Sequence, residues 1–158
     1  MSDFRHVIEI NVSPARVWPV LLDVERWPEW TTSVTRVQRM DIGPLTLGSR
    51  TSIVQPRLSK RVWRVSSLDE THRSFAWTTQ SLGLRIVGYH RVEESDTGGS
   101  HVTLSLHFLG VLGPLIARIF SDLNRDYLAR EGNGLKAHCE VIPWPSALPL
   151  AQSRQGPS

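Results

Sequence analysis

The sequence predicts an α+β fold in which a curved, seven-stranded antiparallel sheet packs around a long C-terminal helix, with two short helices between the first two strands. Residues 114–139 place apolar side chains at three- and four-residue steps, which is typical of an amphipathic helix. Most of the preceding chain alternates apolar and polar residues between turn signals, the pattern of half-buried strands. The long apolar stripe needs a large apolar partner, which these strands can supply.

The first three elements are a strand and two short helices. Residues 4–12 alternate, with Phe4 and three further side chains on one face. Ser13 can cap a helix whose first turn holds Pro14, and Asp23 can cap the next short helical turn. That turn runs into Trp27-Pro28-Glu29-Trp30, whose two indoles make a bulky apolar lid or plug.

Six strands follow, separated by turn residues. Gly43-Pro44, Pro56 and the hairpin signal Asp96-Thr97-Gly98-Gly99 interrupt the pattern. In the last strand, four apolar side chains from Val102 to Phe108 share a face. We expect the strands at residues 34–40, 48–55, 60–68, 73–80, 84–94 and 101–109.

The long helix is expected as one element from Pro114 to Cys139, because proline is tolerated in a first helical turn. Gly132 and Gly134 either allow close packing on the sheet or mark a bend. Its apolar stripe is Leu115, Ile116, Ile119, Phe120, Leu123, Tyr127, Leu128, Leu135 and Cys139.

Composition narrows the class of protein. The chain has 158 residues, 40% hydrophobic and 21% charged, which is ordinary for one soluble domain. The formal charge of +3 comes from scattered arginines, so we expect no nucleic-acid binding. No apolar run is long enough for stable membrane insertion, and no signal-peptide pattern is present. The lone cysteine, Cys139, excludes an intrachain disulfide and fits a cytoplasmic location.

Catalytic and cofactor motifs are not found. The sequence has no Gly-x-Ser-x-Gly elbow, no phosphate-binding loop and no dinucleotide-binding glycine pattern. The six histidines lack a recognised metal-ligand spacing, and His101 and His107 are expected on the outer face of their strand. We therefore expect no metal and no cofactor.

The element order and several local motifs resemble a known family. This chain resembles the START-like (SRPBCC) superfamily with its helix-grip, or Bet v 1-like, fold, specifically the polyketide cyclase/dehydrase and lipid-transport branch. The residues that carry the resemblance are Ser13-Pro14-Ala15-Arg16-Val17-Trp18, Asp23-Val24-Glu25-Arg26-Trp27-Pro28-Glu29-Trp30, Gly48-Ser49-Arg50, Gln55-Pro56-Arg57-Leu58, Val62-Trp63-Arg64-Val65, Phe75-Ala76-Trp77, Gly88-Tyr89-His90, Gly98-Gly99-Ser100-His101-Val102-Thr103, Tyr127-Leu128, Glu131-Gly132 and Gly134-Leu135-Lys136.

The resemblance implies a cavity between the concave face of the sheet and the long helix. Strand and helix phases then give a largely apolar and aromatic lining, as in most small-molecule pockets. The expected lining is Trp27, Trp30, Trp63, Phe75, Trp77, Thr79, Ile86, Gly88, His90, Leu104, Leu106, Phe108, Phe120, Leu123, Asn124 and Tyr127.

The polar members of this lining have two interpretations each. His90 is either a structural histidine on an apolar strand face or the acid/base group of an enzyme. Asn124 and Tyr127 either bind a ligand or bond to strand backbone. Gly88 leaves room for a neighbour or a ligand, or marks a bulge.

Function follows from the resemblance and from the small number of polar groups. We expect residues 1–141 to form one START-like ligand-binding domain, monomeric or homodimeric, and residues 142–158 to form a flexible Pro/Ser/Gln-rich tail. The domain is expected to bind or transport a small hydrophobic molecule such as a polyketide, isoprenoid or lipid. The alternative is an enzyme similar to polyketide cyclases and aromatases, which catalyses dehydration or aldol cyclisation with His90.

Overall fold

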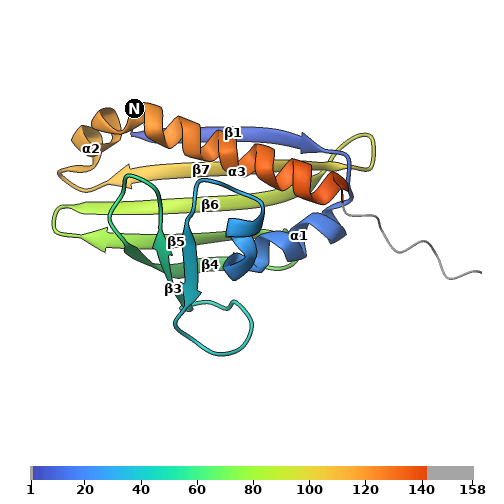
Figure 1. The fold of residues 1–158 in the computed structure, drawn as a ribbon, viewed down its shortest axis with the longest axis horizontal. Coiled ribbons are helices and arrows are strands. Elements are labelled where there is room, and N and C mark those ends of the chain that lie inside the picture. Colours follow the sequence, from blue (N-terminus) through green and yellow to red (C-terminus); the bar gives the residue numbers. More distant parts are fainter. Residues whose placement is uncertain (1, 142–158) are drawn as a thin grey trace, which may run out of the picture.

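The computed structural model describes residues 2–141, and within them the chain forms a seven-stranded antiparallel sheet and four helical segments. The sheet has seven antiparallel strands, as the sequence predicted, and their order is β1-β7-β6-β5-β4-β3-β2. Figure 1 shows α3 crossing the sheet. The elements are β1 (Asp3–Ile10), α1 (Pro14–Leu22), η1 (Val24–Glu29), β2 (Arg36–Arg39), β3 (Arg50–Val54), β4 (Arg61–Asp69), β5 (Ser74–Ser81), β6 (Leu84–Glu94), β7 (Ser100–Leu109), α2 (Gly113–Ile119) and α3 (Ser121–Val141).

The strand faces that the sequence predicted to be apolar are the buried faces of the sheet. In β6, the buried positions are every second residue from Leu84 to Val92, and in β4 Trp63 and Val65 are buried between exposed neighbours. The predicted outward histidines, His101 and His107, are both partly exposed, and His107 pairs with Asp3 at 3.1 Å. Alternation thus places one face of the sheet against the helices.

The two short helices begin where the sequence placed them, but not through the expected side-chain caps. Ser13 and Asp23 hold the N-cap positions of α1 and η1, and neither side chain makes a capping hydrogen bond. Proline in the first turn of α1 starts that helix without a side-chain cap. The indole of Trp27 donates to the carbonyl oxygen of Leu21 at 3.0 Å, which ties η1 back to α1.

The expected single helix over residues 114–139 is wrong in one respect. The backbone leaves helical geometry at Phe120 (φ −101°, ψ 19°), so that α2 and α3 are separate. Residues Leu115 and Ile119 of the predicted stripe are exposed, because α2 does not continue the face of α3. No glycine or proline at the break marks it in the sequence.

The two helix glycines allow close packing, one of the two roles considered for them. A Cβ at Gly132 would lie 2.7 Å from Cδ2 of His6, and a Cβ at Gly134 would overlap the carbonyl oxygen of Trp30. α3 can therefore approach both β1 and the end of η1 closely.

No helix in residues 2–141 combines the length and the apolar character needed to cross a membrane. The tail expected over residues 142–158 lies outside the described residues, and with it the domain boundary.

Candidate functional site

A cavity of about 250 Å³ lies between the sheet, α2, α3 and η1. It is near the end of the sheet where β5 turns into β6 and β7 runs into α2, because Leu84, Phe108 and Ile116 all line it. The structure brings together eleven of the predicted lining residues: Trp27, Trp63, Trp77, Ile86, Gly88, His90, Leu106, Phe108, Phe120, Asn124 and Tyr127.

Five predicted lining residues do not border the cavity: Trp30, Phe75, Thr79, Leu104 and Leu123. Phe75 and Leu104 are buried in the core, and the Phe75 ring stacks on His90 and also contacts Trp18. Trp30 packs on the indole of Trp27 at 5.5 Å, and Thr79 is buried without reaching the cavity. For the strand residues Phe75, Thr79 and Leu104, alternation predicted the correct face of the sheet but not whether the cavity reaches them along the strand.

The lining also includes residues that the sequence reasoning missed: Val34, Ile53, Gln55, Arg57, Leu58, Ser59, Arg61, Leu84, Ser105, Ile116, Leu128 and Glu131. Arg57, Leu58 and Ser59 come from the β3–β4 connection, where no periodicity could place them. Glu131 did have a signal, because it follows Asn124 by seven residues and Tyr127 by four and so shares their helix face.

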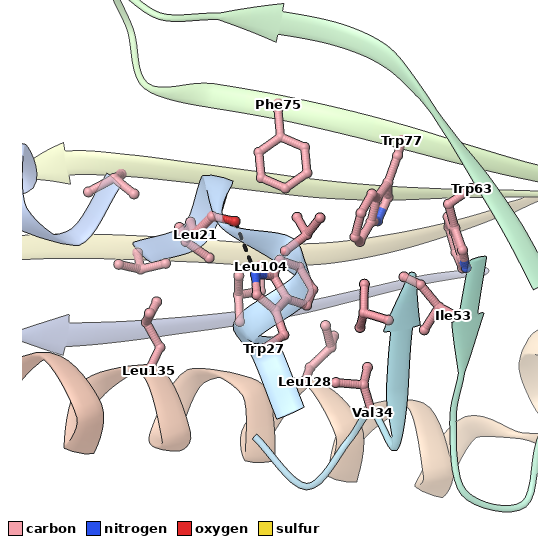
Figure 2. Close-up of a cluster of buried hydrophobic side chains, with 14 of the residues drawn as sticks. Leu21, Trp27, Val34, Ile53, Trp63, Phe75, Trp77, Leu104, Leu128 and Leu135 are labelled. Carbon is pink, nitrogen blue, oxygen red and sulfur yellow. Dashed lines mark hydrogen bonds between the residues drawn. The ribbon is translucent and has the colours of Figure 1, made fainter. Parts of the chain in front are cut away.

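Three indoles form the aromatic wall of the cavity. Trp63 and Trp77 project from the sheet toward α3, and Trp27 lies between the sheet and that helix (Figure 2). The Trp27 and Trp77 rings are 5.1 Å apart, and the Trp63 and Trp77 rings 5.8 Å. A Cβ at Gly88 would lie 2.8 Å from Nε1 of Trp77, so Gly88 makes room for this indole.

His90 of β6 and Glu131 of α3 form a polar pair in the cavity wall. Nε2 of His90 lies 3.1 Å from Oε1 of Glu131, and the two side chains are only 6% and 13% exposed. Three aromatic rings surround the imidazole: Phe75 stacked at 4.3 Å, Trp27 at 5.3 Å and Trp77 edge-on at 5.7 Å. When Glu131 is ionised, its carboxylate can only accept from Nε2–H, and Nδ1 of a neutral imidazole is then a lone-pair acceptor. Nδ1 has no partner within residues 2–141.

Asn124 offers the second unpartnered polar atom of the wall. Its side chain is buried, and Nδ2 makes no hydrogen bond with the described part of the chain. The Tyr127 hydroxyl, by contrast, donates to the backbone carbonyl of Pro56, so it ties α3 to the β3–β4 connection. Burial raises the pKa of Tyr127. Two residues of the lining, His90 and Asn124, therefore each carry a buried side-chain nitrogen without a hydrogen-bond partner among residues 2–141.

Charged and metal-binding groups were also considered. Arg57 and Arg61 line the cavity from the β3–β4 connection and the start of β4, and Arg57 has left-handed backbone geometry (φ 65°). Among residues 2–141, no three His, Cys, Asp or Glu side chains come together in a group that could hold a metal ion.

A protein-family model described as "Polyketide cyclase / dehydrase and lipid transport" matches residues 1–140. No curated protein matches the sequence.

Solved structures show that the fold is shared with proteins of different roles. The Zhui aromatase/cyclase from Streptomyces sp. R1128 superposes with a TM-score of 0.70 at 18% identity, covering 87% of this chain and 93% of that one. Norcoclaurine synthase from Thalictrum flavum, solved with dopamine and hydroxybenzaldehyde, gives 0.67 at 14% identity, covering 86% and 84%. The protein Ara h 8.0201 gives 0.67 at 15% identity, covering 87% and 96%. At these identities the likeness establishes the helix-grip fold and nothing finer.

Proposed function

This chain belongs to the polyketide cyclase/dehydrase and lipid transport family, and on that premise we propose that its cavity binds a small hydrophobic molecule carrying at least one polar group. The observation that carries the proposal is a wall with many aromatic and aliphatic side chains in which His90 and Asn124 each have an unpartnered buried nitrogen, Nδ1 and Nδ2 respectively.

Unpartnered buried polar atoms cost free energy, about 1–3 kcal/mol for each group left without a hydrogen bond. The native state bears this cost at His90 and Asn124, and a ligand that accepts from the amide and donates to the imidazole would remove it. Three indoles nearby would contact the apolar body of that ligand.

The size of the cavity limits the ligand. At about 250 Å³ it is slightly smaller than the roughly 300 Å³ at the lower end of ligand pockets, which favours a compact molecule. A small polyketide, an isoprenoid or a short lipid-like molecule with a hydroxyl or carbonyl group meets this limit. Native mass spectrometry of the protein purified from its own cells would show the mass of a retained ligand.

The ligand found in this way allows a sharp test with Asn124→Leu. Leucine keeps much of the volume but removes the donor, and because Nδ2 has no protein partner, no internal hydrogen bond of that atom is lost. We expect the binding free energy to become about 1–2 kcal/mol less favourable, so that the Kd rises roughly five- to thirtyfold in calorimetric titration. Thr51→Val is the matched control, because Oγ1 of Thr51 is also buried and unpartnered but does not line the cavity. Equal affinities for wild type and Asn124→Leu would contradict the proposed binding mode.

The His90–Glu131 pair supports a second candidate, an enzyme similar to polyketide cyclases. A carboxylate bonded to one imidazole nitrogen orients the ring and stabilises its protonated form, so that the other nitrogen can take a proton from a substrate. In such an enzyme, Glu131→Gln lowers turnover of the identified ligand by about a hundredfold or more, with little change in its Kd. If the wild-type protein leaves that ligand chemically unchanged, binding alone is the function.

A further inference from the structure

Strand alternation gathers three connections at one end of the sheet. Consecutive antiparallel strands turn back at opposite ends, so the β3–β4, β5–β6 and β7–α2 connections share one end, and the β2–β3, β4–β5 and β6–β7 connections share the other. We name the first the cavity end, because Arg57, Leu84, Phe108 and Ile116 all line the cavity there.

The cavity end exposes a cluster of aliphatic side chains. A Cβ at Gly83 would touch the side chains of Leu112 and Val111, and the backbone N–H of Leu112 donates to the carbonyl oxygen of Gly83 at 2.9 Å, so the β5–β6 turn and the β7–α2 connection are in contact. Leu82 is 97% exposed and Val111 88%. We name the cluster the apolar tip: Leu82, Leu109, Val111, Leu112, Leu115 and Ile119.

Isolated exposed apolar residues need no explanation, but six on adjoining segments indicate a surface that binds something. α2 has two roles here, because Ile116 and Phe120 face the cavity while Leu115 and Ile119 are exposed. The apolar tip and the cavity are therefore separated by little more than the thickness of this short helix.

The charges around the apolar tip are mainly positive. Arg85 faces outward opposite Leu109 in the β6–β7 pair, and Arg118 lies three residues after Leu115 on α2; no ion pair of either is found among residues 2–141. The connections at residues 55–60, 82–83 and 110–112 hold Arg57 and Lys60 and no acidic residue. The flanking acids Asp3 and Asp122 each have a basic side chain beside them, His107 at 3.1 Å and Arg125 at 3.7 Å.

From this arrangement we propose that the apolar tip docks the protein reversibly on an anionic lipid membrane. Aliphatic side chains at the tips of adjoining segments can enter the boundary between headgroups and acyl chains, while the surrounding arginines meet anionic headgroups. A protein partner is disfavoured because the cluster lacks the aromatic anchors that dominate protein interfaces. Docking at this end would hold the cavity beside the bilayer, where hydrophobic molecules are concentrated.

Vesicle co-sedimentation tests the proposal without using the unknown ligand. Purified protein should sediment with vesicles of phosphatidylglycerol and phosphatidylcholine at low salt, and far less with vesicles of phosphatidylcholine alone. The double variant Leu82→Ser, Val111→Ser should bind at least about tenfold more weakly, because apolar contact is lost. Arg85→Gln with Arg118→Gln should weaken binding roughly thirtyfold, from about 1 kcal/mol for each arginine near an anionic surface.

The opposite end of the sheet provides the matched control. Ile42 and Leu47 are fully and 69% exposed in the β2–β3 connection, so Ile42→Ser with Leu47→Ser removes comparable apolar surface at the wrong end. This control should bind vesicles like wild type, and unchanged melting curves would show that all variants fold.

Three outcomes would overturn the proposal: no binding to anionic vesicles, equal loss in the control variant, or a wild-type dimer that the apolar-tip variant separates in light scattering. The last would identify a second copy as the occupant. Because these measurements involve no cavity ligand, they stand or fall separately from the proposed binding function.

Discussion

Gly88 controls the cavity through the absence of a side chain. It pairs with Trp77 across β5 and β6, and that indole fills the space where a Cβ would be. Gly88→Ala therefore has to displace Trp77, which we expect to cost about 1–3 kcal/mol in the free energy of unfolding, measured by denaturant titration. At an unobstructed strand position alanine would instead stabilise by about 0.5–1 kcal/mol, so the sign of the change distinguishes the two situations.

Single residues also show where sequence reasoning ends. The positions of Asn124 and Tyr127 in the cavity lining could be predicted from the helix period. Glu131 lies on the same helix face, so its position could have been predicted in the same way. The sequence could not separate Phe75 and Leu104 from the residues that line the cavity. Alternation predicts the face of the sheet on which a side chain lies, but not which part of that face the helices cover. The Tyr127–Pro56 bond depends on a loop whose path has no periodic signal.

At the scale of elements, Glu140 fastens the last turns of α3 to the N-terminal part of the fold. Its Oε1 accepts the backbone N–H of Asn11 at 2.9 Å and the ammonium of Lys136 at 2.6 Å, and Lys136 also donates to the carbonyl oxygen of Glu9. The Asn11 N–H bond is the main cause of the lowered pKa of Glu140, followed by the Lys136 bond.

This lowered pKa fixes the sign of a pH dependence. A carboxyl group with a depressed folded pKa contributes stability above its unfolded pKa of about 4.5, and that contribution is lost as the pH falls through the folded pKa. Glu140→Gln should lower stability by about 0.5–1 kcal/mol at pH 7, since the site is partly exposed. Melting curves recorded at pH 7 and below pH 4 should show that the stability difference between wild type and Glu140→Gln becomes smaller in acid. A difference that stays constant would mean that the substitution acts through packing.

The element order was the most predictable part of the structure. All seven strands and both early helices were expected, because alternation and proline or glycine signals are local. The break at Phe120 was not, since it carries no helix-breaking residue. The separation of α2 from α3 depends on tertiary packing around the cavity, which no window of sequence contains.

For the whole molecule, residues 2–141 already contain the seven strands of the sheet and the helices that pack on it. We therefore propose that residues 142–158 are dispensable for folding, and expect a chain ending at Val141 to melt within about 2 °C of the full chain. A chain that lacks residues 134–158 is the control, because it also loses the buried Leu135 and Cys139 and should not fold stably. If the chain that ends at Val141 melts at a much lower temperature than the full chain, residues 142–158 contribute to the stability of the domain.

The close spacing of the three indoles in the cavity wall gives the protein its own optical reporter. Trp27, Trp77 and Trp63 are near enough for their excited states to couple, and their emission depends on whether water or an organic molecule lies against them. A molecule that enters the cavity should therefore shift or quench the intrinsic fluorescence without any added dye. Candidate ligands can be screened by light alone, against a background emission from Trp18 and Trp30, which do not line the cavity, and from Trp144.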